Sequence, residues 1–405
     1  MTRRVAVTGM GIVSSYGCGF GRFWNGLAAG QGAIRPISSV PATGLRFSNG
    51  AEAVDFSASD HFSGKDADLL DRFAQLAAVA AREAVTDAGL ELTSELREQT
   101  AVVLGCCSGG KATEEDQFRN VWVRGGQRMS PLTIPRAMGS AATSRVSLEH
   151  GFTGPAYTVS TACASANHAI GQAFWLVRNG AAEVAVTGGS EAPFSPGFLM
   201  GWDSLRVVSP DTCRPFSRDR RGLILGEGAA MLVLEPLERA VARGARIWGE
   251  IAGFGMSSDA EHLTHPSALG ASRAMTRALA DAGQLPEAIG YVNAHGTGTV
   301  SNDKTESAAI RMAFGAHASN LQVSATKSMH GHALGAAGAI EAVATLATLK
   351  HGVVPPTANF NEADRDPECD LDVVPNRPRM VQHEWALSNS FAFGGLNAVL
   401  VFRAH

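Results

Sequence analysis

The stretch Val159-Ser-Thr-Ala-Cys163-Ala-Ser-Ala-Asn-His168-Ala-Ile-Gly171 aligns without gaps with Val323-Ser-Ala-Thr-Lys327-Ser-Met-His-Gly-His332-Ala-Leu-Gly335. Each copy has the pattern of a short strand, a turn of small residues and then a helix. The alignment pairs Cys163 with Lys327 and His168 with His332. Similarity between distant segments of one chain is the sign of a repeated structural unit. These two stretches therefore predict a duplicated fold.

Two further pairs of segments repeat in the same order. Ala84-Val-Thr-Asp-Ala-Gly89 resembles Ala278-Leu-Ala-Asp-Ala-Gly283, and Gly226-Glu-Gly-Ala-Ala-Met-Leu-Val-Leu-Glu235 resembles Gly394-Gly-Leu-Asn-Ala-Val-Leu-Val-Phe-Arg403. Both members of the first pair close an expected helix with glycine, the usual signal at a helix end. We predict two halves, residues 1–246 and 247–405, that pack about a pseudo-twofold axis with equivalent turns facing each other.

The pattern of apolar residues predicts a layered α/β protein. Between Leu69 and Ala84 the apolar residues recur at helical spacing. Short apolar runs with glycine nearby occur at 102–104, 184–186, 231–234 and 399–402, as is typical of strands buried on both faces. Strands that alternate with helices indicate a layered α/β architecture.

Composition and charge exclude several classes of protein. Hydrophobic residues make up 45% of the 405 residues, and the formal net charge is −4, so the chain lacks the broad basic surface of a nucleic-acid-binding protein. The longest stretch of small apolar residues, 333–349, contains Glu341 and is too short to span a bilayer. The first residues lack a secretory pattern. We expect a cytoplasmic protein that binds neither nucleic acid nor membrane.

Cys163 stands apart from the other five cysteines. The six are scattered, without the spacing of a zinc site or a disulfide framework, so we expect no metal. Cys163 lies among small residues, after an apolar strand and before a helix that runs to about Arg178. The amino terminus of a helix lowers the pKa of a thiol and makes it more nucleophilic. Cys163 is therefore the candidate nucleophile.

Two histidines are the candidate partners of Cys163. His295 ends an expected strand in Asn293-Ala-His-Gly-Thr-Gly-Thr299, and His332 follows Lys327 in Lys-Ser-Met-His-Gly-His. Both lie on glycine-rich turns of the second half, where the duplication directs them toward Cys163. His330 competes with His332, but the alignment with His168 favours His332 as the residue carried by a helix.

A phosphate-binding loop is an alternative interpretation of one glycine-rich segment. Gly105-Cys-Cys-Ser-Gly-Gly110-Lys111 has the glycine and lysine spacing of a P-loop. The next residue is Ala112, where that motif needs a hydroxyl for Mg²⁺. A P-loop-like nucleotide-binding protein is thus the weaker alternative.

The motifs together resemble those of a known enzyme family. Thr161-Ala-Cys-Ala-Ser165, the segments around His295 and His332, and Asn389-Ser-Phe-Ala-Phe-Gly-Gly395 resemble the β-ketoacyl-acyl-carrier-protein synthases of the Cys-His-His elongating type, in the thiolase-like superfamily. The resemblance covers essentially the whole chain and is strongest to nodulation-type and polyene-pathway ketosynthases. It implies a five-layered αβαβα fold built from two duplicated halves, and no cofactor.

The resemblance also implies a reaction, the decarboxylative Claisen condensation. Cys163 would accept an acyl group from a carrier protein as a thioester. Malonyl carrier protein would then lose CO₂, and the resulting enolate would attack that thioester to give 3-oxoacyl carrier protein in fatty-acid or specialised polyketide and polyene synthesis. His295 and His332 would stabilise the enolate, and the backbone N–H groups of Cys163 and Phe393 would form an oxyanion hole.

Further roles follow from the resemblance position by position. Lys327 would pair with Glu341 and fix the turn of His332, and Phe393 would gate the acyl pocket. Substrate contacts would come from Thr297, Thr299, Ser108, Trp202, Leu223, Phe391 and Arg206. The partners would be acyl carrier protein and a second subunit, in a homodimer or in a heterodimer with a chain-length-factor-like relative. The segment 132–137 would reach into the pocket from a partner subunit.

Two features of the sequence depart from the family or from its relatives. Asp66 and Asp68 lie where related enzymes carry basic residues for docking of the carrier protein.

A thiolase, which uses coenzyme A on the same fold, needs a second cysteine in a Cys-x-Gly turn near the carboxyl end. The only late cysteine is Cys369, followed by Asp370 and Leu371, so a thiolase is the other, weaker alternative.

Overall fold

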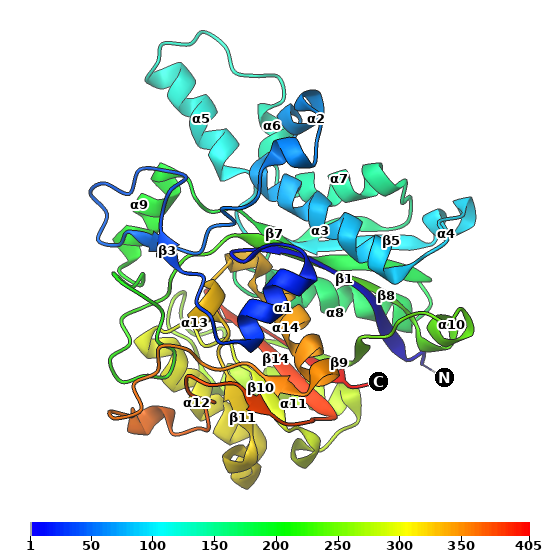
Figure 1. Ribbon diagram of the computed structural model, residues 1–405, viewed down its shortest axis with the longest axis vertical. Coiled ribbons are helices and arrows are strands. Elements are labelled where there is room, and N and C mark those ends of the chain that lie inside the picture. The colour runs from blue at the N-terminus through cyan, green and yellow to red at the C-terminus, as the bar shows by residue number, and fades with distance from the viewer. Residues whose placement is uncertain (1) are drawn as a thin grey trace.

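The computed structural model describes residues 2–405 and arranges the helices around one large sheet (Figure 1). The sheet consists of two similar halves joined along one strand pair. In spatial order, the first half contains β6 (Ala156–Val159), β5 (Thr100–Gly105), β7 (Val184–Glu191), β8 (Gly228–Pro236) and β1 (Val5–Ser14). The second half contains β11 (Gln322–Ser324), β10 (Tyr291–Asn293), β14 (Trp385–Ala392), β15 (Leu396–Arg403) and β9 (Gly249–Ser258).

The two halves of the sheet share one pattern of strand pairing. β6, β5 and β7 are parallel, and β8 and β1 follow as antiparallel neighbours. β11, β10 and β14 are likewise parallel, and β15 and β9 follow as antiparallel neighbours. β1 and β9 pair with each other, antiparallel, where the halves meet. The duplication predicted from the repeated segments is confirmed.

Glycines at equivalent places in the two halves let a helix lie against a strand. Gly11 on β1 packs against α3 (Arg72–Ala88), and Gly255 on β9 packs against α11 (Ala268–Ala282). A Cβ atom on Gly11 would lie 2.0 Å from the carbonyl oxygen of Ala80, and one on Gly255 would lie 2.2 Å from that of Ala274. No side chain fits at either position. Both helices end at the expected left-handed glycine, Gly89 or Gly283.

The helices form three layers that enclose the two half-sheets. α3 and α7 (Ala141–His150) pack on the outer face of the first half, and α11 and α12 (Val300–Phe314) pack on the outer face of the second. α8 (Ser165–Arg178) and α14 (Ala337–His351) lie between the halves in the largest core cluster. The predicted five-layered αβαβα architecture is confirmed.

The other elements connect these layers, and α5 projects from the body at the top of Figure 1. No helix in residues 2–405 is both long and apolar enough to cross a membrane. The connecting elements are β2 (Gly17–Cys18), α1 (Phe20–Ala28), β3 (Arg35–Pro36), β4 (Asn49–Gly50), η1 (Ala58–Asp60), α2 (Gly64–Asp68), α4 (Ser94–Glu98), α5 (Lys111–Trp122), α6 (Thr133–Ala137), α9 (Pro196–Leu205), α10 (Leu237–Ala242), η2 (Pro286–Ala288), η3 (Gly315–Asn320), α13 (Lys327–His330), η4 (Leu334–Ala336), β12 (Val353–Val354), η5 (Pro367–Cys369) and β13 (Arg379–Met380).

The ungapped alignment of the two active-site segments fails after the strand. In the first half α8 follows Cys163 almost at once, whereas in the second half α13 and η4 come before α14. His168 therefore lies within α8, but His332 lies in the irregular segment between α13 and η4. The prediction that a helix carries His332 was wrong. Gly331, with φ of 70°, ends α13 one residue earlier.

Candidate active site

Cys163 lies in the tight turn between β6 and α8. Ala162, immediately before it, has φ of 49°, a left-handed conformation that residues other than glycine rarely adopt. Such local strain is common where a chain must present a reactive side chain. Cys163 is 8% exposed, and in the part of the chain that the structure describes its backbone N–H donates to no protein acceptor. The turn thus offers both a thiol and a free N–H donor.

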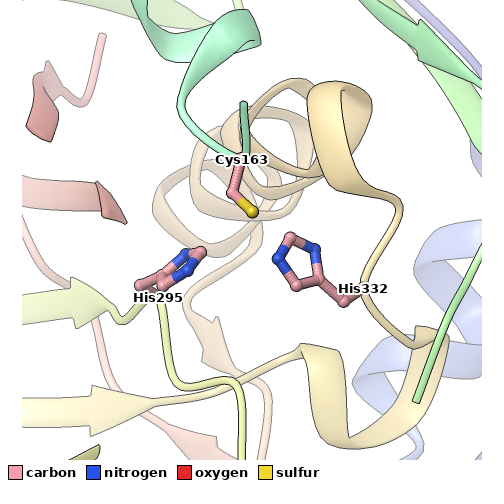
Figure 2. A group of neighbouring side chains, drawn as sticks. All are labelled: Cys163, His295 and His332. Atoms are coloured by element: carbon pink, nitrogen blue, oxygen red, sulfur yellow. The ribbon is translucent and has the colours of Figure 1, made fainter. Parts of the chain in front are cut away.

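His295 and His332 approach Cys163 from the second half of the chain. Figure 2 shows both rings beside the sulfur, with His295 following β10 and His332 following α13. Sγ of Cys163 and one nitrogen of each ring all lie within 4.8 Å of one another. The ring centroids are 5.3 Å apart, with an angle of 86° between the planes. The structure therefore brings together the three residues that the duplication directed toward one site.

Hydrogen bonds set which nitrogen of each ring carries the proton. The backbone N–H of Leu334 donates to Nδ1 of His332 at 3.1 Å, and Nζ of Lys327 lies 3.3 Å from Nδ1 of His295. A ring nitrogen that accepts a hydrogen bond holds no proton, so the proton of the neutral ring is on Nε2. Nε2 of His332 is buried and has no protein partner. Both rings are thus placed to donate Nε2–H to a substrate oxygen.

Burial determines the charge of these side chains. Burial, and then the positive charge of Lys327, lower the pKa of both His295 and His332 well below the usual value, so the rings are neutral. Burial raises the pKa of the Cys163 thiol to about 12, although Lys327 acts against it. Our expectation that the start of α8 would acidify this thiol was wrong, because desolvation of the thiolate outweighs the nearby positive charges.

Lys327 and Glu341 form a fully buried ion pair behind the two histidines. Nζ of Lys327 also donates to the carbonyl oxygen of His295 at 2.7 Å. Burial raises the pKa of Glu341 to about 7, while the charge of Lys327 acts in the opposite direction. Lys327 therefore links α13, α14 and the loop after β10, the three elements that hold the histidines in place.

A cavity of about 390 Å³ opens onto Cys163, His295 and His332. The ring of Phe393 stacks on Trp202 along its wall, with the centroids 6.3 Å apart. Ser108 is not part of the wall, because its hydroxyl and its backbone N–H both bond to the buried Glu191. The expected substrate residues that do line the cavity are Thr297, Thr299, Trp202, Leu223, Phe391 and Arg206.

Cys163, His295 and His332 form a group that could in principle hold a metal ion; within residues 2–405 it is the one such group of at least three His, Cys or acidic side chains. A metal ligand must offer a lone pair. Here both Nδ1 atoms are occupied by donors, so both Nε2 atoms carry protons, and Lys327 adds a positive charge behind His295. The arrangement therefore suits an anionic oxygen of a substrate and not a cation.

Comparisons with known proteins agree with this geometry. The family model for the N-terminal domain of beta-ketoacyl synthases matches residues 2–240, and the model for their C-terminal domain matches residues 248–361. The chain belongs to the β-ketoacyl synthase family. This synthase is an acyltransferase of the condensing type, as its motifs predicted.

Individual relatives match this synthase over its full length. It is 46% identical to nodulation protein E of Rhizobium sp. (strain N33), with all of both chains covered. It is 42% identical to 3-oxoacyl-[acyl-carrier-protein] synthase 2 of Synechocystis, with 100% of this chain and 98% of the relative covered. Among solved structures, the ishigamide ketosynthase/chain length factor matches with a TM-score of 0.94, 38% identity and full coverage of both chains. A type II PKS acyl-carrier protein in complex with its ketosynthase matches with a TM-score of 0.90, 30% identity and full coverage of both chains.

The two alternative functions do not fit the structure of the synthase. In the segment with P-loop spacing, the backbone N–H groups of Cys107 and Ser108 donate to the carboxylate of Glu191 at 2.8 and 3.1 Å. A carboxylate of the protein thus occupies the donors that would bind a phosphate, and the nucleotide-binding alternative was wrong. The late cysteine that a thiolase would need, Cys369, is buried beside Asp366 and does not line the cavity.

Two buried carboxylates of the site were missed in the sequence. Glu306 accepts the backbone N–H groups of His295 and Gly296, both at 2.8 Å. Asp303 accepts those of Phe216 and Gly298 at 2.8 and 3.2 Å. Together they hold the loop after β10. Their signal was present, because they are acidic residues in the first two turns of a helix that starts directly after a glycine-rich loop.

Proposed function

We propose that this synthase elongates acyl chains on a carrier protein, with Cys163 as the nucleophile. An acyl group passes from the carrier thioester to Sγ, and the thiol proton leaves on the carrier thiol. Malonyl carrier protein then binds and loses CO₂, and its enolate attacks the acyl thioester to give 3-oxoacyl carrier protein and free Cys163. One observation carries the proposal. Sγ of Cys163 and one nitrogen of each of the two neutral imidazole rings lie within 4.8 Å of one another, and all three residues line one cavity.

The oxyanion of the acyl transfer is stabilised by two backbone N–H groups in this proposal. Neither the N–H of Cys163 nor that of Phe393 donates to a protein acceptor within the described residues, and both residues line the cavity. Free donors that face a developing oxyanion lower the barrier by roughly 3 to 4 kcal/mol each in other acyl-transfer enzymes. Phe393 also covers the acyl pocket as a gate, together with Phe391.

The enolate of the malonyl group is stabilised by His295 and His332. Each donates Nε2–H to the thioester oxygen on which negative charge develops. Burial and the charge of Lys327 keep both rings neutral, and the contacts at Nδ1 keep the remaining proton of each ring on Nε2. Lys327 is a positioning residue, and Glu341 balances its charge.

The remaining cavity residues bind the substrate arms. The hydroxyl groups of Thr297 and Thr299 lie 2.9 Å apart near the mouth of the cavity, where they can bond the amides of a pantetheine arm. Trp202 and Leu223 belong to one apolar cluster with Phe393 and accept the acyl chain. Ser108 supports this wall from behind through Glu191.

The partners in this proposal are acyl carrier protein and a second subunit. The carrier docks at the cavity mouth, where Arg206 is exposed. A homodimer, or a heterodimer with a chain-length-factor-like relative, is supported by α6, whose Ile134 is 75% exposed, and by the exposed strand β6 at the sheet edge. The proposed use of acyl carrier protein as the carrier of both substrates also supports a cytoplasmic location for the synthase.

Intact-mass analysis tests the proposal. The purified synthase is incubated with a panel of acyl carrier proteins, and the acyl adduct is mapped to a residue. We expect an adduct on Cys163 that disappears, with release of CO₂, when malonyl carrier protein is added. Absence of any acyl adduct on Cys163 across the panel, or an adduct that malonyl carrier protein does not consume, overturns the proposal.

A further inference from the structure

The segment Asp259–Ser267 forms part of the cavity rim. It lies against the gate loop, the turn at 393–395 between β14 and β15 that carries Phe393. It connects β9 with α11, and its residues 263–266 line the cavity. Its base is firmly held, because the backbone N–H of Asp259 donates to the carbonyl oxygen of Gly395 at 2.9 Å and the Asp259 carboxylate accepts from Ser267 and Asn397. We call this segment the rim loop.

A second bond joins the tip of the rim loop to the gate loop. The backbone N–H of Gly394 donates to the carbonyl oxygen of Leu263 at 2.7 Å. Gly394 directly follows Phe393, whose free N–H is the proposed oxyanion donor. A one-residue separation leaves little room for independent movement, so the position of the Leu263 carbonyl also sets where the Phe393 N–H points.

His262 holds the tip of the rim loop in its turn. Its Nδ1 accepts the backbone N–H groups of Thr264 at 3.0 Å and His265 at 3.1 Å. Nδ1 of His265 lies 3.0 Å from the same atom, and the ring centroids are 4.3 Å apart. Since Nδ1 of His262 is already an acceptor, the proton between the two rings is on His265. The turn therefore requires His262 to be neutral.

We propose that His262 is a positioning residue for the oxyanion hole, acting through the Leu263 carbonyl on the N–H of Phe393. This inference rests on the proposed function, because it assigns a cause to the geometry of one oxyanion donor.

The experiment compares two half-reactions in two variants of His262. His262→Ala removes the acceptor, whereas His262→Asn keeps a side-chain oxygen that can accept the same N–H groups. We expect His262→Ala to slow acylation of Cys163 roughly ten-fold, part of the 10²- to 10³-fold cost of losing an oxyanion donor. The rate at which His262→Ala decarboxylates malonyl carrier protein should stay within two-fold of the wild-type rate, because that step uses the Nε2–H donors of His295 and His332.

Rescue by the conservative variant supplies the second readout. His262→Asn should acylate Cys163 at close to the wild-type rate, because its side-chain oxygen can accept the two N–H groups of the turn. Glu261→Gln is the matched control in the same loop and should behave as the wild type. Alkylation of Cys163 by iodoacetamide checks that the thiol remains accessible in each variant.

Two results would overturn the inference. One is acylation by His262→Ala at the wild-type rate, and the other is a loss of acylation in His262→Asn as large as that in His262→Ala. Equal losses in acylation and decarboxylation would also count against it, because they indicate general damage to the site. Failure of the wild type to form acyl-Cys163 at all would instead refute the proposed function, so the two failures are distinguishable.

Discussion

The backbone N–H of Leu334 donates to Nδ1 of His332 at 3.1 Å, which leaves the ring proton on Nε2 and directed at the cavity. Leu334 itself has φ of 46°, so the chain adopts an uncommon conformation at the residue that makes this bond. A main-chain donor cannot rotate away as a hydroxyl can. His332 is thereby kept with its remaining hydrogen-bond donor, Nε2–H, free toward the cavity.

Replacing either histidine should remove decarboxylation. We expect His332→Ala and His295→Ala each to reduce CO₂ release from malonyl carrier protein by at least about 100-fold, the scale for loss of one preorganised donor. Labelled CO₂ released from malonyl carrier protein is the measurement. Acylation of Cys163 serves as the control for folding, and unchanged CO₂ release in either variant would contradict the assigned roles.

Replacing the nucleophile should separate the two half-reactions. Cys163→Ala cannot form the acyl thioester, so we expect no condensation product, while some decarboxylation of malonyl carrier protein remains because His295 and His332 are intact. Product formation is followed by mass spectrometry of the carrier protein. Elongation that persists in this variant would show that another residue accepts the acyl group.

Buried His330 should make the protein less stable in acid. Burial, and then the charge of Lys327, lower the pKa of His330 to about 3, below the ordinary value of about 6.5 in the unfolded chain. Between these values the unfolded state binds a proton that the native state does not, so the free energy of unfolding falls as pH falls below about 6.5. At pH 5 the free energy of unfolding should be about 2 kcal/mol lower because of this one residue.

Urea unfolding at pH 7 and pH 5 measures this effect. The difference in the free energy of unfolding between pH 7 and pH 5 should be smaller in His330→Gln than in the wild type by about 2 kcal/mol. Any effect of the substitution that does not depend on pH cancels in this comparison. His405→Gln is the control, because His405 is exposed. An unchanged difference in His330→Gln would place the acid sensitivity elsewhere, for example at His295 or His332.

The contact between β1 and α3 should not tolerate a methyl group. Gly11→Ala places a Cβ atom 2.0 Å from the carbonyl oxygen of Ala80, and we expect a loss of about 3 kcal/mol or more, the upper end for overpacking. Gly21→Ala is the matched control, since Gly21 lies in α1 with nothing within 4 Å of the added atom. There the same change should leave stability equal or raise it by up to about 1 kcal/mol. Thermal unfolding of both variants is the check, and similar melting temperatures would refute the packing argument.

Local patterns in the sequence predicted the fold class and the three residues that the structure brings together at the cavity. The repeated segments and the glycine-capped helices are written in short stretches of chain, so the duplication could be predicted without coordinates. Cys163 and His295 stand on turns at the ends of β6 and β10, whereas His332 follows the short helix α13. The residue types and their place in the repeat were enough to bring them together.

The sequence alone could not predict contacts that arise between distant segments. Ser108 was expected in the acyl pocket, but Glu191, at the end of β7, binds its hydroxyl and its N–H. His332 was expected on a helix, but Gly331 ends the helix before it. Both errors came from reading a short segment without the neighbours that compete for its hydrogen bonds.

The tertiary structure alone decided the chemical state of the site. Burial raises the pKa of the Cys163 thiol to about 12, although its place before a helix suggested the opposite. The contacts of Lys327 and Leu334 put the protons of both histidines on Nε2. Sequence specifies which groups can ionise, whereas the loss of water around them and the charges packed beside them determine whether they do.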